Sequence, residues 1–163
     1  MKLQVRYANH PEDSKHYTTE ELRRHYLMEK VFEADEILLV YSHQERIISG
    51  GIMPVKKALP LETSDEWRAA YFLERRELGV INIGGAGKIV VDGVEYKMNP
   101  KDGLYVGMGS KELVFTSEDS ANPAKFYVNS APAHTTYPIV KIDIEKANPV
   151  KLGSLANSNE RTI

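Results

Sequence analysis

The spacing of apolar positions along the chain changes near residue 36. From there on, short runs rich in valine, isoleucine, tyrosine and phenylalanine alternate with glycine, proline, asparagine and aspartate. Breaks about every 8 to 12 residues between such runs predict many short strands. The predicted strands cover residues 37–41, 47–55, 70–75, 79–83, 87–91, 94–98, 103–106, 112–116 and 125–130. About nine strands in one domain predict an all-β jelly roll.

Two local motifs predict individual elements. In residues 88–96, Asp92 and Gly93 join two β-prone arms, which predicts a hairpin closed by a two-residue type I′ turn. Earlier in the chain, Thr18 and Glu21 match a capping box, in which each side chain binds the backbone N–H of the other. The box predicts a short N-terminal helix over residues 19–30.

The pattern divides the chain into three parts. Residues 1–35 form an N-terminal extension with the short helix, and residues 36–150 form the β domain. Residues 131–138 are loop-like, and residues 151–163 are mostly small and polar, as in a linker. Because β-prone residues return at Thr162 and Ile163, where a new element would begin, we expect this chain to be cut from a longer one.

Composition narrows the classes of function. The chain has 163 residues, of which 42% are hydrophobic and 27% charged, as in a globular domain. Its net charge of -2 argues against a nucleic-acid partner. No apolar run approaches the ~20 residues of a membrane span, and the start lacks a signal peptide, so we expect no membrane association and a cytoplasmic location. With no cysteine, any metal site needs histidine and carboxylate ligands.

The glycines at 84, 85 and 87 allow two interpretations. A phosphate-binding loop would need a following Lys-Ser or Lys-Thr and a helix, whereas strands are predicted on both sides here, which favours a tight turn or bulge. The spacing Gly85-x-Gly87-x5-Gly93-x8-Asp102 resembles the central hairpin of cupins, which are small jelly-roll barrels. We therefore predict a cupin-like jelly-roll β-barrel.

The cupin resemblance also places the family's metal ligands on this chain. Glu77 and Gly84 fit the second half of the first cupin motif, and counting from them puts the ligand positions on Tyr71, Leu73, Glu77 and Glu112. Leucine cannot bind a metal, and two carboxylates without imidazole would hold a transition metal poorly. We predict a metal-free cupin, with Tyr71 and Leu73 filling the core and Glu77 hydrogen-bonded.

Residues 72–78 carry four charges between apolar ends. In a strand, Glu74 and Arg76 share one face while Arg75 and Glu77 share the other, so one pair points inward or meets another chain. Charges paired at a subunit interface explain this pattern at least as well as substrate binding does. We favour the subunit interface as the explanation of these charges.

Several segments closely resemble the 4-deoxy-L-threo-5-hexosulose-uronate ketol-isomerase family, also called 5-keto-4-deoxyuronate isomerases. They are residues 29–32, 34–36, 40–43, 46–54, 71–87 (YFLERRELGVINIGGAG), 123–127 and 131–138 (APAHTTYP). The resemblance implies a cytoplasmic enzyme of pectin and uronate breakdown that converts 5-dehydro-4-deoxy-D-glucuronate to 3-deoxy-D-glycero-2,5-hexodiulosonate. It also implies a homohexamer in which each subunit has two cupin barrels. In such a subunit, a His-x-His-x4-Glu motif and a later histidine bind zinc in the C-terminal barrel. This chain contains no His-x-His and none of that second barrel.

No catalytic residue of the family can be assigned to this chain, but a sugar-acid substrate needs a receptor for its carboxylate, and an arginine fork is the natural one. Loops on a β scaffold often carry binding residues. The candidate substrate-binding residues are His43, Arg46, Arg75, His134 and Arg161. Two functions stay open: the N-terminal portion of the zinc isomerase, serving mainly as scaffold and subunit contact, or a self-standing metal-free cupin that binds a sugar acid or mediates oligomerisation.

Overall fold

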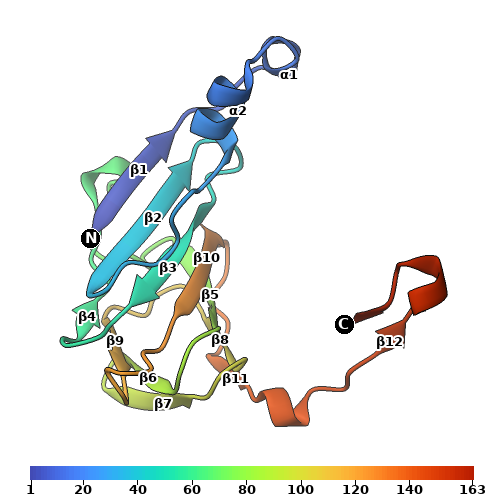
Figure 1. The fold of residues 1–163 in the computed structure, drawn as a ribbon. Helices are drawn as coiled ribbons and strands as arrows, with labels where there is room; N and C mark the ends of the chain where they lie inside the picture. Colours follow the sequence, from blue (N-terminus) through green and yellow to red (C-terminus); the bar gives the residue numbers. More distant parts are fainter.

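A computed structural model describes all 163 residues and contains two main β-sheets (Figure 1). The large sheet has the order β1 (Lys2–Arg6), β2 (Glu36–Ser42), β3 (Ile48–Met53), β10 (Phe126–Pro132), β5 (Arg76–Asn82), β8 (Gly103–Val106) and β11 (Val140–Ile142). The small sheet has the order β4 (Leu59–Pro60), β9 (Leu113–Ser117), β6 (Gly87–Val91) and β7 (Val94–Met98). The predicted all-β class is confirmed, but the two sheets stay separate and do not close into one barrel.

The core lies between the two sheets. In β2 every second residue is buried, so Ile37, Leu39 and Tyr41 point inward, as period-two alternation requires. The rings of Phe115 on β9 and Phe126 on β10 meet across the core, with centroids 5.3 Å apart. The core therefore joins a strand of each sheet by direct side-chain contact.

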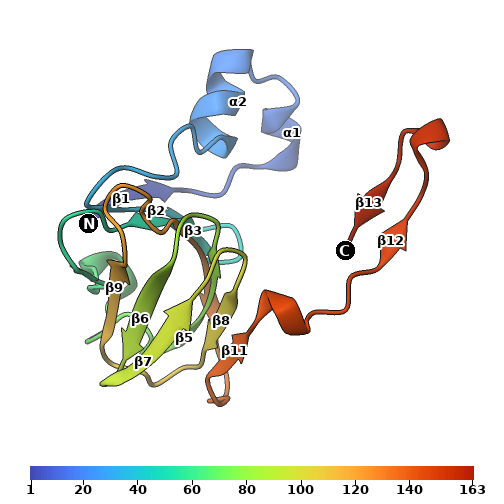
Figure 2. The same ribbon diagram turned by 60° about the horizontal axis from the view of Figure 1, so that its bottom comes forward.

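Helix α2 (Thr19–Tyr26) begins at the predicted capping box. The Thr18 hydroxyl accepts from the Glu21 N–H, and the Glu21 carboxylate accepts from the Thr18 N–H. The helix is shorter than predicted, because the chain turns extended at Leu27. A second short helix, α1 (Pro11–Ser14), precedes it, and both lie beyond one end of the large sheet (Figure 2). Neither helix has the length and apolar composition that crossing a bilayer would require.

The predicted hairpin is confirmed. Asp92 and Gly93 both have positive φ, at 47° and 83°, which is the conformation of a type I′ turn. The Asp92 carboxylate also accepts from the N–H groups of Lys111 and Glu112, which attaches the turn to the loop before β9.

Two predictions were wrong, and several strands were not predicted, among them β1 and β11. Residues 70–75 form turns rather than a strand, because the Glu74 carboxylate accepts from the Ala70 N–H at 2.6 Å and closes a local loop. The face-sharing of Glu74 with Arg76 therefore does not occur. Strand β1 was placed in an extension and β11 beside a loop, yet both pair with the large sheet, β1 parallel to β2 and β11 antiparallel to β8.

The glycine-rich segment between β5 and β6 is a tight turn, as favoured above, and not a phosphate-binding loop. A Cβ atom on Gly84 would lie 2.4 Å from the Lys125 nitrogen, and one on Gly85 would lie 2.0 Å from the Asn122 carbonyl oxygen. The buried Asn82 amide donates to the carbonyls of Gly85 and Met98 and accepts from the N–H groups of Gly84 and Lys125. Close backbone approach therefore explains these glycines.

Residues beyond about 147 leave the body of the domain as an arm. Both views show this arm extending to one side, and it ends in a small hairpin of β12 (Lys151–Leu152) and β13 (Arg161–Thr162) (Figures 1 and 2). The assignment of these residues as a linker stays a prediction.

The root of the arm is attached through Asp102, whose side chain is almost fully buried. Its carboxylate accepts from the N–H groups of Asn99 and Ile144 at 2.8 and 3.0 Å and lies 3.1 Å from Lys141 Nζ. Burial alone would raise the pKa of Asp102, but the two backbone hydrogen bonds and the lysine outweigh it and hold the pKa below its usual value. The ionised form is therefore the one that the fold stabilises.

We expect the free energy of unfolding to fall as the pH drops through the ordinary titration range of an aspartate carboxyl, about 4, and below it. The pKa of Asp102 is lower in the folded state than in the unfolded chain, so its contribution is present above the unfolded pKa and is lost on acidification. Urea titrations over this pH range should show that the free energy of unfolding falls less steeply with decreasing pH for Asp102→Asn than for wild type. Asp119→Asn, at an exposed position, is the control. If the free energy of unfolding depends on pH in the same way in both variants, ionised Asp102 does not stabilise the fold.

Candidate functional site

A cavity of about 300 Å³ lies at one end of the strands of the large sheet, where β5 begins and β2 and β10 end. Antiparallel pairing places these strand ends together, because β10 lies between β3 and β5. The cavity is lined by Tyr41, Arg46, Glu66, Trp67, Arg68, Ala69, Arg75, Arg76 and Pro132. Since four of these nine residues are arginines, we call it the arginine pocket.

Arg76 forms the buried part of the arginine pocket and is only 5% exposed. Its Nη2 donates to the carbonyls of Arg46 and Ser130 at 2.6 and 2.9 Å, and its Nε donates to the Ser130 hydroxyl at 3.1 Å. The guanidinium carbon lies 5.8 Å from the centre of the Tyr41 ring. Burial lowers the pKa of Arg76, as does the neighbouring charge of Arg46. Its Nη1 makes no hydrogen bond within the chain.

Two of the pocket arginines have left-handed backbones, Arg46 with φ 55° and Arg68 with φ 46°. This conformation is uncommon for residues other than glycine and costs on the order of 1 kcal/mol. Each of the two is held through its carbonyl group: Arg76 donates to the Arg46 oxygen and Arg75 donates to the Arg68 oxygen. The adjacent Arg75 and Arg76 therefore fix the two loops that bring Arg46 and Arg68 to the pocket.

Aromatic residues form an apolar wall of the arginine pocket. Trp67 packs edge-on against Tyr41 and Phe72, with ring centroids 5.9 and 5.5 Å away, and its indole N–H donates to the Thr63 hydroxyl at 3.0 Å. His43 lies next to this wall, 5.0 Å from the Tyr41 ring. These contacts fix an apolar wall beside the arginines.

None of the four arginines of the pocket forms an ion pair within the chain. Glu66 is the one acidic residue in the lining, and it is exposed. Unpaired guanidinium groups around a concave site suit the binding of an anion, and a carboxylate or phosphate can take two parallel hydrogen bonds from each. The lining contains no histidine and no buried carboxylate that would serve as a general acid or base.

The structure brings together some of the candidate residues and separates others. Arg46 and Arg75 both line the pocket, and His43 contacts its wall through Tyr41. His134 is exposed in the bend after β10 and is not part of the lining. Arg161 lies on β13, in the arm that projects from the domain (Figure 2), and is not part of the lining. Sequence reasoning did not place Arg68 or Trp67 at the site.

The residues at the cupin ligand positions do not fit a zinc site. Leu73 is fully buried in the core, as predicted, while Tyr71 is only half-buried. Glu77 lies on the outer face of β5, where its carboxylate accepts from the Tyr105 hydroxyl at 2.8 Å. Burial and this carboxylate raise the pKa of Tyr105 to about 12. Glu112 is exposed beside the small sheet, and no three histidine, aspartate or glutamate residues of the chain converge.

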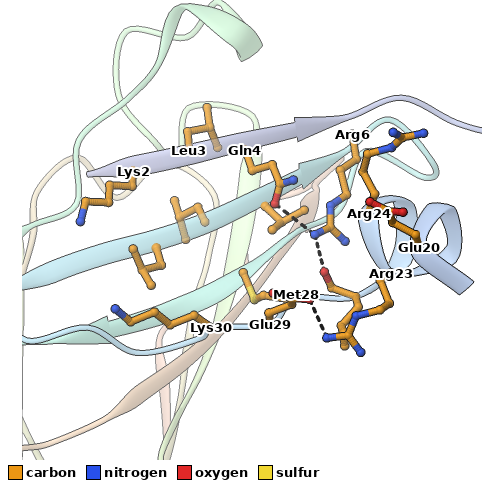
Figure 3. Close-up of a pocket in the computed structure, with 14 residues that line it drawn as sticks. Lys2, Leu3, Gln4, Arg6, Glu20, Arg23, Arg24, Met28, Glu29 and Lys30 are labelled. Carbon is orange, nitrogen blue, oxygen red and sulfur yellow. Dashed lines mark hydrogen bonds and ion pairs between the residues drawn. The ribbon is translucent and has the colours of Figure 1, made fainter.

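A larger groove of about 540 Å³ runs between α2 and the strands β1 and β2 (Figure 3). Its charges are mostly satisfied within the chain. Arg6 donates to the Leu27 carbonyl at 2.6 Å and to the Gln4 side chain at 3.0 Å, and Arg23 pairs with Glu29 at 2.6 Å (Figure 3). This groove is therefore a weaker candidate for binding an anion than the arginine pocket.

Comparison with known proteins identifies the family. The model of the KduI/IolB family matches residues 26–163. The chain belongs to the KduI/IolB family. A family relative from Lachnoclostridium phytofermentans, named 4-deoxy-L-threo-5-hexosulose-uronate ketol-isomerase, is 54% identical over 161 residues, covering 99% of this chain and 58% of that protein. A relative of the same name from Yersinia pseudotuberculosis is 55% identical over 163 residues, covering 99% of this chain and 59% of that protein.

This KduI/IolB chain thus spans a little under three-fifths of the length of the curated relatives it matches. Among solved structures, an IolB-like protein from Salmonella typhimurium LT2 is 15% identical, with a TM-score of 0.54 over 71% of this chain and 42% of that chain. An RmlC-like cupin from Desulfovibrio desulfuricans is 21% identical, with a TM-score of 0.44 over 66% of this chain and 94% of that chain. The all-β class is confirmed, and the IolB-like structure has a similar fold; the two sheets of this chain do not close into a barrel.

Proposed function

We propose that this chain is the N-terminal portion of a ketol-isomerase that converts 5-dehydro-4-deoxy-D-glucuronate to 3-deoxy-D-glycero-2,5-hexodiulosonate in the cytoplasmic breakdown of pectin and other uronate polymers. The observation that carries the proposal is the 54% identity, over nearly the whole chain, to a protein named for this class of reaction. The unpaired arginines of the pocket agree with an acidic sugar as substrate.

The proposal divides the work between this chain and the part of the relatives that it does not match. A ketol isomerisation moves hydrogen between adjacent carbons, which needs a general base and a polarised carbonyl. Because the residues of this chain do not fit a zinc site, we assign zinc to the unmatched part, where it would polarise the carbonyl when bound.

The contribution of this chain is then mainly scaffold and subunit contact in a homohexamer. The outer face of the large sheet supports this role, because it leaves apolar side chains in water: Ile81, Val140 and Ile142 are each about half exposed. A shallow apolar hollow of about 220 Å³ lies on the same face, lined in part by Ile81, Tyr105 and Ile142. Exposed apolar surface of this kind is typical of contact sites.

A chimaera tests the isomerase assignment. We expect that substituting this chain for the matching segment of the Lachnoclostridium phytofermentans relative gives a zinc-containing isomerase with kcat/KM within about tenfold of that relative. Turnover is measured by formation of the 2,5-diketo product, and zinc by elemental analysis. A folded, zinc-loaded chimaera without activity would contradict the proposal.

The same assay applied to the 163-residue chain alone separates the two functions left open by the sequence. We expect no turnover by the chain supplied with zinc, because its residues provide no ligand set. The arginine pocket favours, as the second candidate, a metal-free cupin that binds a sugar acid without catalysis. An inactive chimaera combined with sugar-acid binding by the chain would support that second function.

A further inference from the structure

We propose that the arginine pocket is a binding site for the carboxylate of a hexuronate, with the sugar ring against Trp67 and Tyr41. The choice of a sugar acid rests on the proposed function, whereas anion binding rests on this chain alone. Nothing in the cupin metal positions or in the family resemblance assigns a role to this pocket.

The first argument is the missing counter-charge. Buried cations in proteins are nearly always paired, because removing a charge from water is strongly unfavourable. Arg76 is buried without an acidic partner, and its Nη1 is left unused. A ligand carboxylate at the mouth of the pocket would supply the counter-charge and accept from Nη1.

The second argument is preorganisation. Arg46 and Arg68 hold left-handed backbones that cost energy, and the neighbouring arginines fix both of them through their carbonyl groups. The backbones that carry Arg46 and Arg68 are thus fixed before a ligand arrives, which reduces the entropy lost on binding. Arg68 and Arg75 are themselves exposed, so their guanidinium groups can reach a ligand.

The third argument concerns the choice between a sugar carboxylate and a free phosphate. Both can be held by paired guanidinium groups, but a small inorganic anion would use only the charged side of the pocket. The wall of Tyr41, Trp67 and Pro132 is apolar, and a cavity of about 300 Å³ lies at the small end of the range for organic ligands. A sugar ring that bears a carboxylate would contact both, with its carboxylate at the arginines and its ring against the apolar wall.

Titration of the 163-residue chain with galacturonate, galactose and inorganic phosphate tests the proposal by calorimetry and NMR. We expect galacturonate to bind with a Kd at least about tenfold lower than that for galactose or phosphate, with shifts at the Trp67 indole. Arg68→Gln and Arg75→Gln should each raise the Kd for galacturonate about tenfold or more. Arg24→Gln is the matched control, because Arg24 is also exposed and unpaired but lies on α2.

Thermal unfolding of each variant separates loss of binding from loss of fold. Equal binding of galactose and galacturonate, phosphate binding as tight as galacturonate, or loss of binding in Arg24→Gln would each overturn the proposal, as would no binding at all. An active chimaera whose parent chain fails to bind galacturonate would overturn this inference alone. Binding of galacturonate together with an inactive chimaera would overturn only the isomerase assignment.

Discussion

Gly50→Ala is expected to destabilise the chain by about 4 kcal/mol and to lower its melting temperature by about 10 °C. Gly50 lies in the middle of β3, paired with Leu39 on β2 and Val128 on β10. A Cβ atom there would lie 2.0 Å from the Leu38 carbonyl oxygen and 2.8 Å from Leu39 Cδ2. Because the first of these is backbone, the clash can be relieved only by separating two central strands.

Gly79→Ala on β5 is the matched control. Gly79 also occupies an interior strand position, but a Cβ atom there would meet nothing closer than the Asn129 oxygen at 3.8 Å. Since glycine in a strand costs about 0.5 kcal/mol relative to alanine, this variant should be neutral or slightly more stable. Urea unfolding followed by the fluorescence of Trp67, the single tryptophan, measures both. Similar midpoints for the two variants would refute the steric explanation.

Asn82→Ala is expected to cost about 3 kcal/mol, because one side chain satisfies four backbone groups. The Asn82 amide is fully buried, donates to two carbonyls at 2.8 and 2.9 Å and accepts from two N–H groups at 3.1 and 3.2 Å. These groups belong to the turn after β5, the end of β7 and the start of β10. Its loss leaves buried polar groups in three segments without partners.

The exposed Asn157 provides the comparison, because its side chain makes no hydrogen bond within the chain. Asn157→Ala should change the free energy of unfolding by less than about 0.5 kcal/mol. Amide hydrogen exchange gives a second measurement: in Asn82→Ala the N–H groups of Gly84 and Lys125 should lose protection. Full protection at both amides would mean that water replaces the side chain at no cost.

Most of the strands between residues 36 and 130 were predictable because they are short runs of β-branched and other apolar residues between turn residues. In β2 and β6 nearly every residue is apolar, and burial alternates along each strand, while the Asp92–Gly93 turn is recognisable because its residue types favour positive φ. Residues 70–75 show the limit of this reasoning. Phe72 and Leu73 are buried as strand residues would be, but inside a turn, and composition does not distinguish the two.

Of the strands that were not predicted, β1 and β11 depend on contacts that are distant in sequence. β1 pairs in parallel with β2 across a connection that contains both helices, and a parallel partner leaves no turn signal. β11 has three residues and is held in place by the contacts of Asp102 with Lys141 and Ile144. The alternation of polar and apolar residues in Lys2–Arg6 does indicate a strand, whereas β11, with three residues, is too short to show a pattern.

The candidate site was partly predictable for a chemical reason. A sugar acid requires a guanidinium receptor, which pointed to Arg46 and Arg75, and both line the pocket. Arg68 and Trp67 reach the pocket through a single 3-10 turn, Asp65–Trp67, whose only sequence signal is the capping Ser64. The pairing of Arg76 with the Arg46 carbonyl spans 30 residues and has no local pattern.

The position of β10 has a consequence for synthesis on the ribosome. β10 is inserted between β3 and β5, although it is made after both of them and after the whole small sheet. At ~5–20 residues per second, the facing edges of β3 and β5 wait several seconds for their shared neighbour. Unpaired strand edges can join other chains, so the nascent polypeptide is most exposed to misassociation during this interval. Slow codons before residue 126 would lengthen this interval, and chaperones that bind extended segments would protect the nascent chain during it.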